Sequence, residues 1–363
     1  MIEGKITGNK GEWSEVYTLF KLLGDGKVHA GDADMNKLPL YYPIIDIIRK
    51  ESHRFDYMPN PKGSVVVINS DGEEYAKIPM QRFLEEAEKL LEKLKEKKER
   101  AFNVASTEKF MKEIGASKLK APSTDKSDIT IVIHDLRTSM RHKLGFSIKS
   151  QIGHPSTLLN AGTTTNIAFR ITGVPMDDDE AASINNISKH LPRIEAIYSR
   201  GHQLQFSHIR NTTFENNLLF LDSCMPEFIA RCLIIDSQSS DSTVRHAVEE
   251  VAKDNPFEYK GNVVKYYEHK MKQLLLASAL GMVPTREWTG KFDANGGYLV
   301  VKSDGDIVCY HFYNQNDVED YLYNNTRFER ASRTRYDFGR IYKETPEASE
   351  FYLDLNLQIR FIK

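Results

Sequence analysis

The residues best suited to chemistry lie on two segments that we expect to be neighbouring strands. Asp128 opens an apolar run, 129–133. The next strand carries Ser147, Lys149 and Gln151 on one face, because side chains alternate along a strand. A carboxylate can hold a divalent metal, and a lysine can polarise the attacking water or stabilise charge on a phosphorane. The pairing therefore indicates metal-dependent phosphodiester hydrolysis.

The charge around these strands is strongly biased towards cations. No Asp or Glu lies between Asp135 and Asp177, although the chain as a whole carries a formal net charge of only -2. A local cationic patch on a nearly neutral protein suits a polyanion that is held at one site. An ordinary hairpin with a solvated basic turn is the simpler alternative. We take as candidate DNA-binding residues of this patch Arg137, Arg141 and Lys143.

Length and composition favour an ordinary globular protein. The 363 residues suffice for two domains or one elaborated domain. Three cysteines without metal-ligand spacing argue against a disulfide framework and for a reducing cytoplasm. The first residues lack the apolar core of a signal peptide, and no apolar run approaches the length of a membrane span. We therefore expect a cytoplasmic protein.

Periodicity predicts an α/β fold with a mixed central sheet flanked by helices, plus helical and β insertions. We expect a nuclease core with N-terminal helices over 1–175, a mainly helical region over 176–290 and a β-rich DNA-contacting region over 291–363. Helices are expected over 12–23, 81–100, 106–114 and much of 178–280, and a helical turn over 155–160. Strands are expected within 39–80 and over 129–133, 145–151, 164–172, 297–302, 307–311 and 353–361.

Two charged segments have structural explanations. The helix at 80–101 carries an apolar stripe that could bind a partner helix, but packing on its own domain is the commoner use of such a stripe. The acidic run 177–180 could hold a metal. We prefer to place it in the first turn of a helix, where acidic side chains suit the helix dipole.

A second cationic cluster lies near the C-terminus, where an arginine fork would suit guanine O6 and N7 or a phosphate. Arg333 and Arg335 would share a face on a strand, and in a loop both could still reach one groove. A solvated loop with local ion pairs is the alternative for any one arginine. We take as candidate DNA-binding residues of this cluster Arg327, Arg330, Arg333 and Arg335.

Four runs, taken together, resemble the HpaII family of type II restriction endonucleases: 12–23, 145–153, 156–161 and 355–361. The similarity extends from the first helix to the C-terminus. It implies a PD-(D/E)XK nuclease that cuts unmodified CCGG in double-stranded DNA after the first C. It also implies a companion cytosine methyltransferase that protects the same site in host DNA.

Carried over to this sequence, the resemblance makes Asp128 the metal-binding aspartate and Lys149 the lysine of the motif. Two positions depart from the PD-(D/E)XK motif that the resemblance implies. Ser127 stands where Pro is frequent, and Ser147 stands where Asp or Glu is expected. The site is therefore short of one carboxylate. Glu15 on the first helix is our candidate to supply it, and Gln151 is a weaker candidate as a neutral oxygen ligand.

We therefore expect an Mg²⁺-dependent nuclease whose catalytic set is Asp128, Lys149, Glu15, Ser147 and Gln151, with Asp128 and Glu15 binding the metal. A palindromic target suggests a homodimer, although a monomer that nicks each strand in turn stays open. Two other classes also stay open. One is a DNA-binding protein that does not cut, which the serine at 147 would favour. The other is an interaction scaffold built on the charged helix at 80–101.

Overall fold

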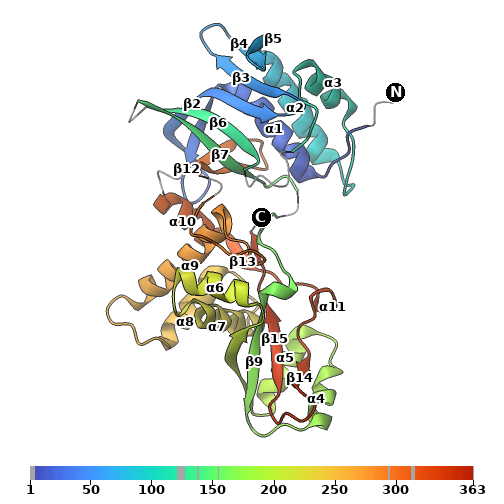
Figure 1. The fold of residues 1–363 in the computed structure, drawn as a ribbon, viewed down its shortest axis with the longest axis vertical. Coiled ribbons are helices and arrows are strands. Elements are labelled where there is room, and N and C mark those ends of the chain that lie inside the picture. Colours follow the sequence, from blue (N-terminus) through green and yellow to red (C-terminus); the bar gives the residue numbers. More distant parts are fainter. Residues whose placement is uncertain are drawn as a thin grey trace. The chain divides into compact units, whose positions relative to one another are not determined.

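The computed structural model describes residues 5–120, 127–136, 139–153, 155–292, 295–311 and 315–362. The chain forms two compact units, shown in Figure 1. Unit 1 comprises 1–156, 292–321 and 363, and unit 2 comprises 157–291 and 322–362. This division differs from the three consecutive regions expected above, because the hairpin near residue 300 belongs to the N-terminal unit.

Unit 1 is built on a mixed sheet, as the sequence predicts. Its strand order is β1-β12-β11-β7-β6-β2-β3-β4-β5 among the described residues. The β1–β12 and β11–β7 pairs are parallel, and the other neighbouring pairs are antiparallel. The strands are β1 (Lys27–Gly31), β2 (Lys37–Lys50), β3 (Arg54–Asn60), β4 (Val65–Ser70), β5 (Glu73–Pro79), β6 (Ile129–Asp135), β7 (Met140–Ser150), β11 (Gly297–Val301) and β12 (Ile307–His311).

Helix α1 (Lys10–Asp25) crosses the core of unit 1. Asn9 and Glu12 form a capping box at its start, so two backbone N–H groups of the first turn are satisfied. The helix ends at Gly26, whose φ of 64° favours glycine. The helix therefore extends beyond residue 23, where the sequence predicts its end. Trp13 and Phe20 are fully buried, which fixes this helix against the sheet.

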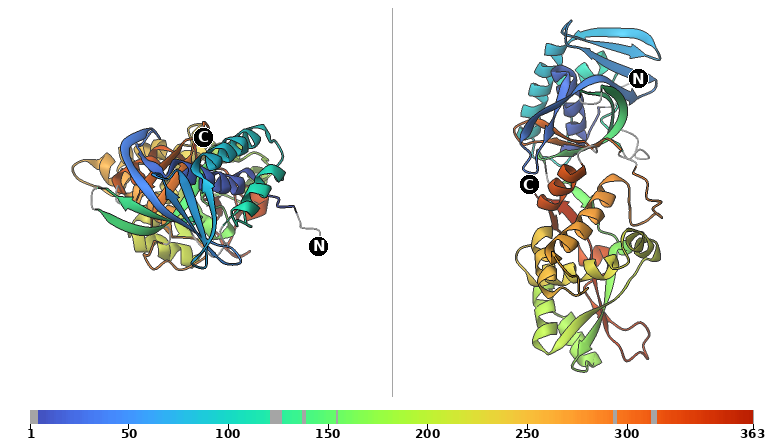
Figure 2. Two further views of the ribbon diagram at one scale, coloured as in Figure 1. Left: turned by 90° about the horizontal axis from the view of Figure 1, so that it is seen from above. Right: turned by 90° about the vertical axis from the view of Figure 1, so that its left-hand side faces the viewer.

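Helix α2 (Met80–Glu96) directs its apolar stripe into the same core. Phe83, Ala87, Leu90 and Leu94 are buried there, with residues of α1 and of the sheet. Helices α1 and α2 both cover one face of this sheet, and α3 (Ala105–Glu113) joins the same core (Figure 2). The stripe that a partner helix would need is thus used inside unit 1.

Unit 2 combines two smaller sheets with most of the helices. One sheet has the order β10-β9-β15-β14 and the other the order β13-β16-β8. The strands are β8 (Thr157–Leu159), β9 (Asn166–Gly173), β10 (His202–Ile209), β13 (Thr326–Phe328), β14 (Ile341–Tyr342), β15 (Tyr352–Asn356) and β16 (Ile359–Phe361). The helices are α4 (Asp178–Asn185), α5 (His190–Ser199), α6 (Thr212–Leu221), α7 (Met225–Gln238), α8 (Val244–Asp254), α9 (Val263–Leu280) and α11 (Arg333–Tyr336). Helix α10 (Gln315–Asn324) begins in unit 1 and ends in unit 2.

Two expectations for unit 2 are wrong. The helical turn expected over 155–160 is the short strand β8, which pairs with β16. The single C-terminal strand is two strands in different sheets. The chain leaves the first sheet after Asn356, whose side-chain amide donates to Gly162 O at 2.8 Å and to Asn166 Oδ1 at 2.7 Å. Those bonds turn the chain locally, and alternation of residue types does not reveal them.

The acidic run 177–180 begins α4, as expected. The Asp177 side chain accepts a hydrogen bond from Glu180 N and so caps the helix. Among the helices that the structure describes, none is both long and apolar enough to span a membrane.

Candidate active site

The β6–β7 hairpin brings three of the predicted catalytic residues together, Asp128, Ser147 and Lys149. Its antiparallel register pairs Ile129 with Phe146 and Thr130 with Gly145. Asp128, just before β6, is held by β7. Its N–H donates to Phe146 O at 2.9 Å. Its Oδ2 accepts from Ser147 Oγ at 3.1 Å and from Ile148 N at 2.6 Å. The serine that replaces the expected acid therefore orients the aspartate.

Lys149 lies on the same face of β7 as Ser147 and is half-buried. Its Nζ is 5.3 Å from the ring centroid of the buried Tyr298. Burial lowers the pKa of Lys149, while the carboxylates of Asp128 and Glu15 oppose that shift by favouring the charged amine. The lysine therefore lies within electrostatic range of both carboxylates that were proposed as metal ligands.

Glu15 reaches the site from α1. A hydrogen bond of 2.8 Å joins the hydroxyls of Ser14 and Ser150, which fixes the start of α1 beside the end of β7. Glu15 is half-buried next to this bond. Glu12 has a different role, because its carboxylate caps α1 and forms an ion pair of 2.7 Å with Lys120. The structure thus separates the two glutamates that the sequence places on one side of the helix.

The donor set suits a hard cation that keeps much of its own water. Among the described residues, no group of three His, Cys, Asp or Glu side chains could hold a metal ion. Asp128 and Glu15 would supply two carboxylates. Mg²⁺ in enzymes that act on phosphates is usually bound through one or two carboxylates, water and substrate oxygens. The two acids therefore suit an Mg²⁺ ion that is coordinated by both the protein and the DNA.

Gln151 is directed elsewhere. Its Nε2 lies 3.2 Å from Met35 Sδ, and its N–H donates to Val301 O at 2.9 Å. Within the described parts of the chain, no hydrogen bond joins it to Asp128. The structure therefore does not bring Gln151 to the carboxylates, and Glu15 is the better placed of the two substitutes.

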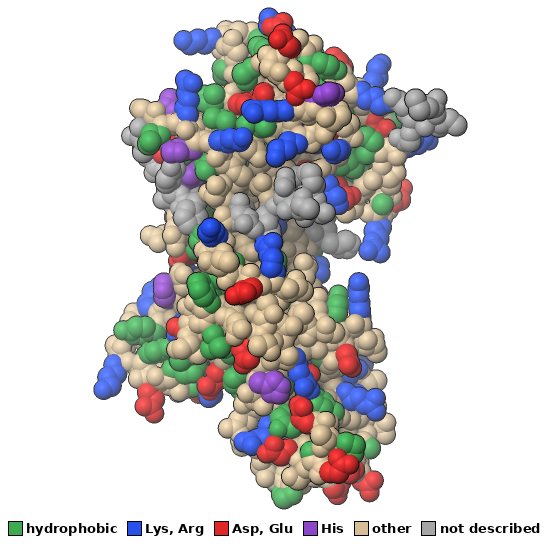
Figure 3. All heavy atoms as spheres, in the orientation of Figure 1, with side chains coloured by type: hydrophobic (Ala, Val, Ile, Leu, Met, Phe, Trp, Pro, Cys, Tyr) green, Lys and Arg blue, Asp and Glu red, His purple; other side chains and the backbone are tan. Residues whose placement is uncertain are grey.

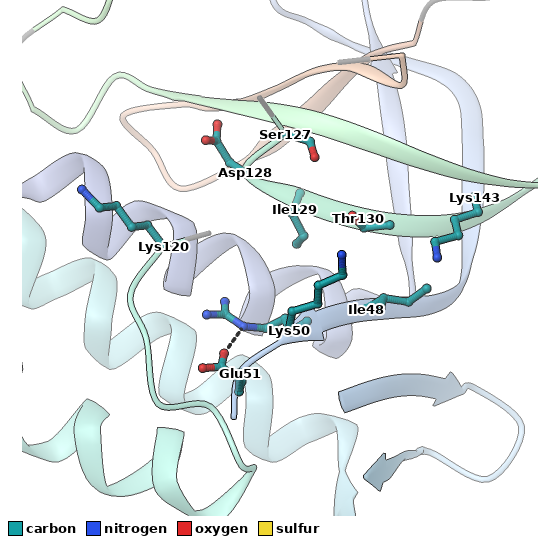
Figure 4. Close-up of a pocket in the computed structure, with 10 residues that line it drawn as sticks. Ile48, Lys50, Glu51, Lys120, Ser127, Asp128, Ile129, Thr130 and Lys143 are labelled. Atoms are coloured by element: carbon teal, nitrogen blue, oxygen red, sulfur yellow. Dashed lines mark hydrogen bonds and ion pairs between the residues drawn. The ribbon is translucent and has the colours of Figure 1, made fainter. Parts of the chain in front are cut away.

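Several cations lie on the same face of β6 and β7 as the site, where part of the sheet is exposed. Arg137 lies outside the described residues, whereas Arg141 and Lys143 are exposed on β7. Figure 3 shows Lys and Arg side chains gathered on this part of unit 1. Asp128 lines a cavity of about 150 Å³ together with Lys50, Lys120 and Lys143 (Figure 4). Lys50 and Lys120 were not predicted from the sequence, because only the tertiary structure brings β2 and the segment after α3 next to Asp128.

The C-terminal arginines of unit 2 are largely occupied. Arg330 Nη2 donates to Asp236 O and Ser239 O, each at 3.0 Å, and so closes the end of α7. Arg327 forms an ion pair with Glu329 at 2.6 Å. Arg333 donates a hydrogen bond to Ser188 O. Each of the three thus has a role within unit 2.

Arg333 and Arg335 do not share a face. They lie on the short helix α11, where residues two apart differ by about 200° around the axis. Arg335 is exposed, and its guanidinium carbon lies 5.3 Å from the ring centroid of Tyr336. A strand would have aligned the two arginines. The helix leaves Arg335 as the more accessible one.

The similarities to known proteins cover nearly the whole chain. Residues 9–361 match the HpaII restriction endonuclease family. The chain is 41% identical over 360 residues to the type II restriction enzyme HpaII of Haemophilus parainfluenzae, covering 98% of this chain and 99% of the relative. No solved structure matches the chain. The chain therefore belongs to the HpaII family of type II restriction endonucleases, which are site-specific deoxyribonucleases.

Proposed function

We propose that this enzyme is an Mg²⁺-dependent PD-(D/E)XK nuclease that cuts double-stranded DNA at CCGG, after the first C. Support comes from the family membership and from the arrangement of Asp128, Glu15 and Lys149 at the end of the β6–β7 hairpin. The products of such a cut carry a 5′-phosphate and a 3′-hydroxyl.

The observation that carries the proposal is the Asp128 carboxylate, which two donors on β7 fix beside Lys149. Asp128 and Glu15 would hold the metal, which supplies positive charge to the reacting phosphate. Lys149 faces the same space. Its amine orients the attacking water and stabilises the negative charge that develops on the phosphorane. The lowered pKa also makes its neutral form more accessible than that of an ordinary lysine, so that it can accept a proton from that water.

Ser147 has a positioning role in this proposal. In the motif of the fold an acid at this position would bind the metal directly. Here the hydroxyl donates to Asp128 Oδ2 at 3.1 Å and leaves the other carboxylate oxygen available. Ser147 thus supplies no ligand to the metal, but its hydrogen bond orients the carboxylate of Asp128. Metal binding then depends more strongly on Glu15.

The proposed target also suggests the partners. A companion cytosine methyltransferase would modify the same CCGG site and protect host DNA. A palindrome can be cut by a homodimer, whose two sites are related by the symmetry of the DNA. A monomer that nicks each strand in turn would give the same ends.

The test is digestion of phage DNA, with sequencing of the ends. We expect cuts after the first C of CCGG in Mg²⁺, none in EDTA, and none when the site carries cytosine methylation. Cuts at another sequence would refute the proposed target. Specific binding without any cut in Mg²⁺ would instead support the DNA-binding protein that does not cleave.

A further inference from the structure

Parts of β2, β6 and β7 are exposed or half-buried on one face of the unit 1 sheet, and this face carries both the proposed catalytic residues and further lysines. Register places Ile48 opposite Thr130 and Val132 opposite Lys143. Opposite residues share a face, and so do residues two apart on one strand. Lys50 and Lys143 therefore lie on the face that Asp128 and Ser147 occupy. Residues on the other face of these strands, such as Ile47 and Ile131, are buried in the core.

The cavity beside Asp128 has an excess of cations. Its charged lining consists of Arg49, Lys50, Lys120, Lys143, Glu51 and Asp128. Two of these cations are already paired: Arg49 Nε lies 2.8 Å from Glu51 Oε1, and Lys120 Nζ lies 2.7 Å from Glu12 Oε1. Within the described part of the chain, Lys50 and Lys143 form no ion pair or hydrogen bond. Both are exposed.

These two lysines converge. Figure 4 shows the side chains of Lys50, from β2, and Lys143, from β7, directed into the same space. Two like charges that face one another repel, and an anion between them turns that repulsion into two attractions. A water molecule takes up roughly 30 Å³ in the liquid, so the cavity of about 150 Å³ has room for an anion larger than water.

We propose that Lys50 and Lys143 bind one backbone phosphate of the DNA strand that is being cut, within a few nucleotides of the phosphate that reacts at Asp128. This inference rests on the proposed function. Lys143 lies four residues before Ser147 on β7, which is about 13 Å at the usual rise of about 3.3 Å per residue. The bound phosphate is thus a near neighbour of the scissile one. Such a contact positions the DNA and carries no sequence information.

Duplex binding in Ca²⁺ at several salt concentrations tests the lysine pair, because it measures binding without cleavage. We expect Lys50→Ala and Lys143→Ala each to weaken cognate and random duplexes alike, by about tenfold, and to lower the salt slope by about one. Lys50→Arg should retain most of the affinity. Lys89→Ala is the control, since this exposed lysine lies on α2, which covers the opposite face.

A second experiment identifies the phosphate. Single phosphates near the cut are replaced by neutral methylphosphonates. We expect one position to weaken wild-type binding and to have no further effect on the Lys50→Ala and Lys143→Ala variants. The inference would be overturned if both variants bound DNA like the wild type, with an unchanged dependence on salt. It would also be overturned if each methylphosphonate position weakened binding equally in the wild type and in both variants. Calorimetric binding of inorganic phosphate that depends on Lys50, with unchanged DNA affinity, would show a free-anion site and also overturn it. Failure of the proposed function would appear separately, as a wild type that does not cut CCGG.

Discussion

The two cationic segments of this chain look alike in the sequence and differ in the structure. In unit 1, Arg141 and Lys143 are exposed on the strand that also carries Lys149, the proposed catalytic lysine. In unit 2, Arg330 and Arg333 donate to backbone carbonyl groups, and Arg327 pairs with Glu329. Positive charge is therefore available to DNA in the first segment and is mostly used for packing in the second.

The difference shows that a count of cations does not locate a nucleic-acid surface. A guanidinium has five donors in a fixed fork, so nearby carbonyl groups readily occupy it. Lys50 and Lys143 form no ion pair or hydrogen bond within the described part of the chain, although Lys143 interacts electrostatically with Asp46. Which cations can contact DNA depends on the hydrogen-bond acceptors that the fold brings close to them. Substitutions in the two units can separate cations that contact DNA from cations that stabilise the fold.

The largest effect should come from the lysine at the centre of the unit 1 site. Lys149→Ala should lower the cleavage rate by about a hundredfold to ten-thousandfold, because the group that acts on the water or the phosphorane is lost. Specific DNA binding should remain. Single-turnover cleavage and Ca²⁺ binding measure the two properties. A variant that cuts at near the wild-type rate would refute the assignment.

Glu15 should have the next largest effect. Glu15→Gln should weaken Mg²⁺ binding and the rate together, by at least about tenfold to a hundredfold, because even the loss of a hydrogen-bond partner of a metal ligand costs that much. Glu12→Gln is the matched control, because Glu12 caps α1 and pairs with Lys120. Calorimetric Mg²⁺ titration of the DNA complex tests the pair. Unchanged metal binding in the Glu15 variant would move the role to water.

Arg330 should matter for stability more than for DNA. Arg330→Ala removes two hydrogen bonds at the end of α7 and leaves the buried Asp236 without its nearest cation. We expect the free energy of unfolding to fall by about 2 kcal/mol. Arg335→Ala should change it by less than about 0.5 kcal/mol. Denaturant unfolding of both variants decides this, and equal losses would contradict the distinction.

Arg335 is the arginine of the C-terminal cluster that we still expect to read a base. Arg335→Ala should reduce the difference in binding free energy between the cognate and a random duplex by about 1–2 kcal/mol. The ratio of the two affinities falls accordingly. Arg141→Ala should lower both affinities with little change in their ratio, as a phosphate contact does. Competition binding in Ca²⁺ measures the ratio. If Arg335→Ala keeps the full ratio, base recognition lies elsewhere in unit 2.

The smallest effect concerns pH. Burial raises the pKa of Asp236 to about 6, although Arg330 opposes the shift. Between the unfolded value of about 4 and this value, the folded state binds more protons than the unfolded state, so stability falls as pH rises. Asp236 should make the protein about 1 kcal/mol more stable at pH 5 than at pH 6. Asp236→Asn should remove that contribution, and an unchanged slope in chemical unfolding would contradict it.

The local elements of the site could be predicted from the sequence alone. Asp128 and Lys149 could be placed on adjacent strands because alternation and a short connection define a hairpin. The helix that carries Glu15 was equally clear from its periodicity, and so was the helical nature of much of unit 2. These features depend on neighbours along the chain, which the sequence shows directly.

Which side chains meet became clear from the tertiary structure. It joined Ser147 to Asp128, separated Glu15 from Glu12, and turned Gln151 towards Met35. It also placed Lys50 beside Lys143 and gave the arginines of unit 2 their acceptors. The physical reason is that hydrogen bonds and ion pairs act over a few ångströms in space, between strands and helices whose order in the sheet has no counterpart in the order of the chain.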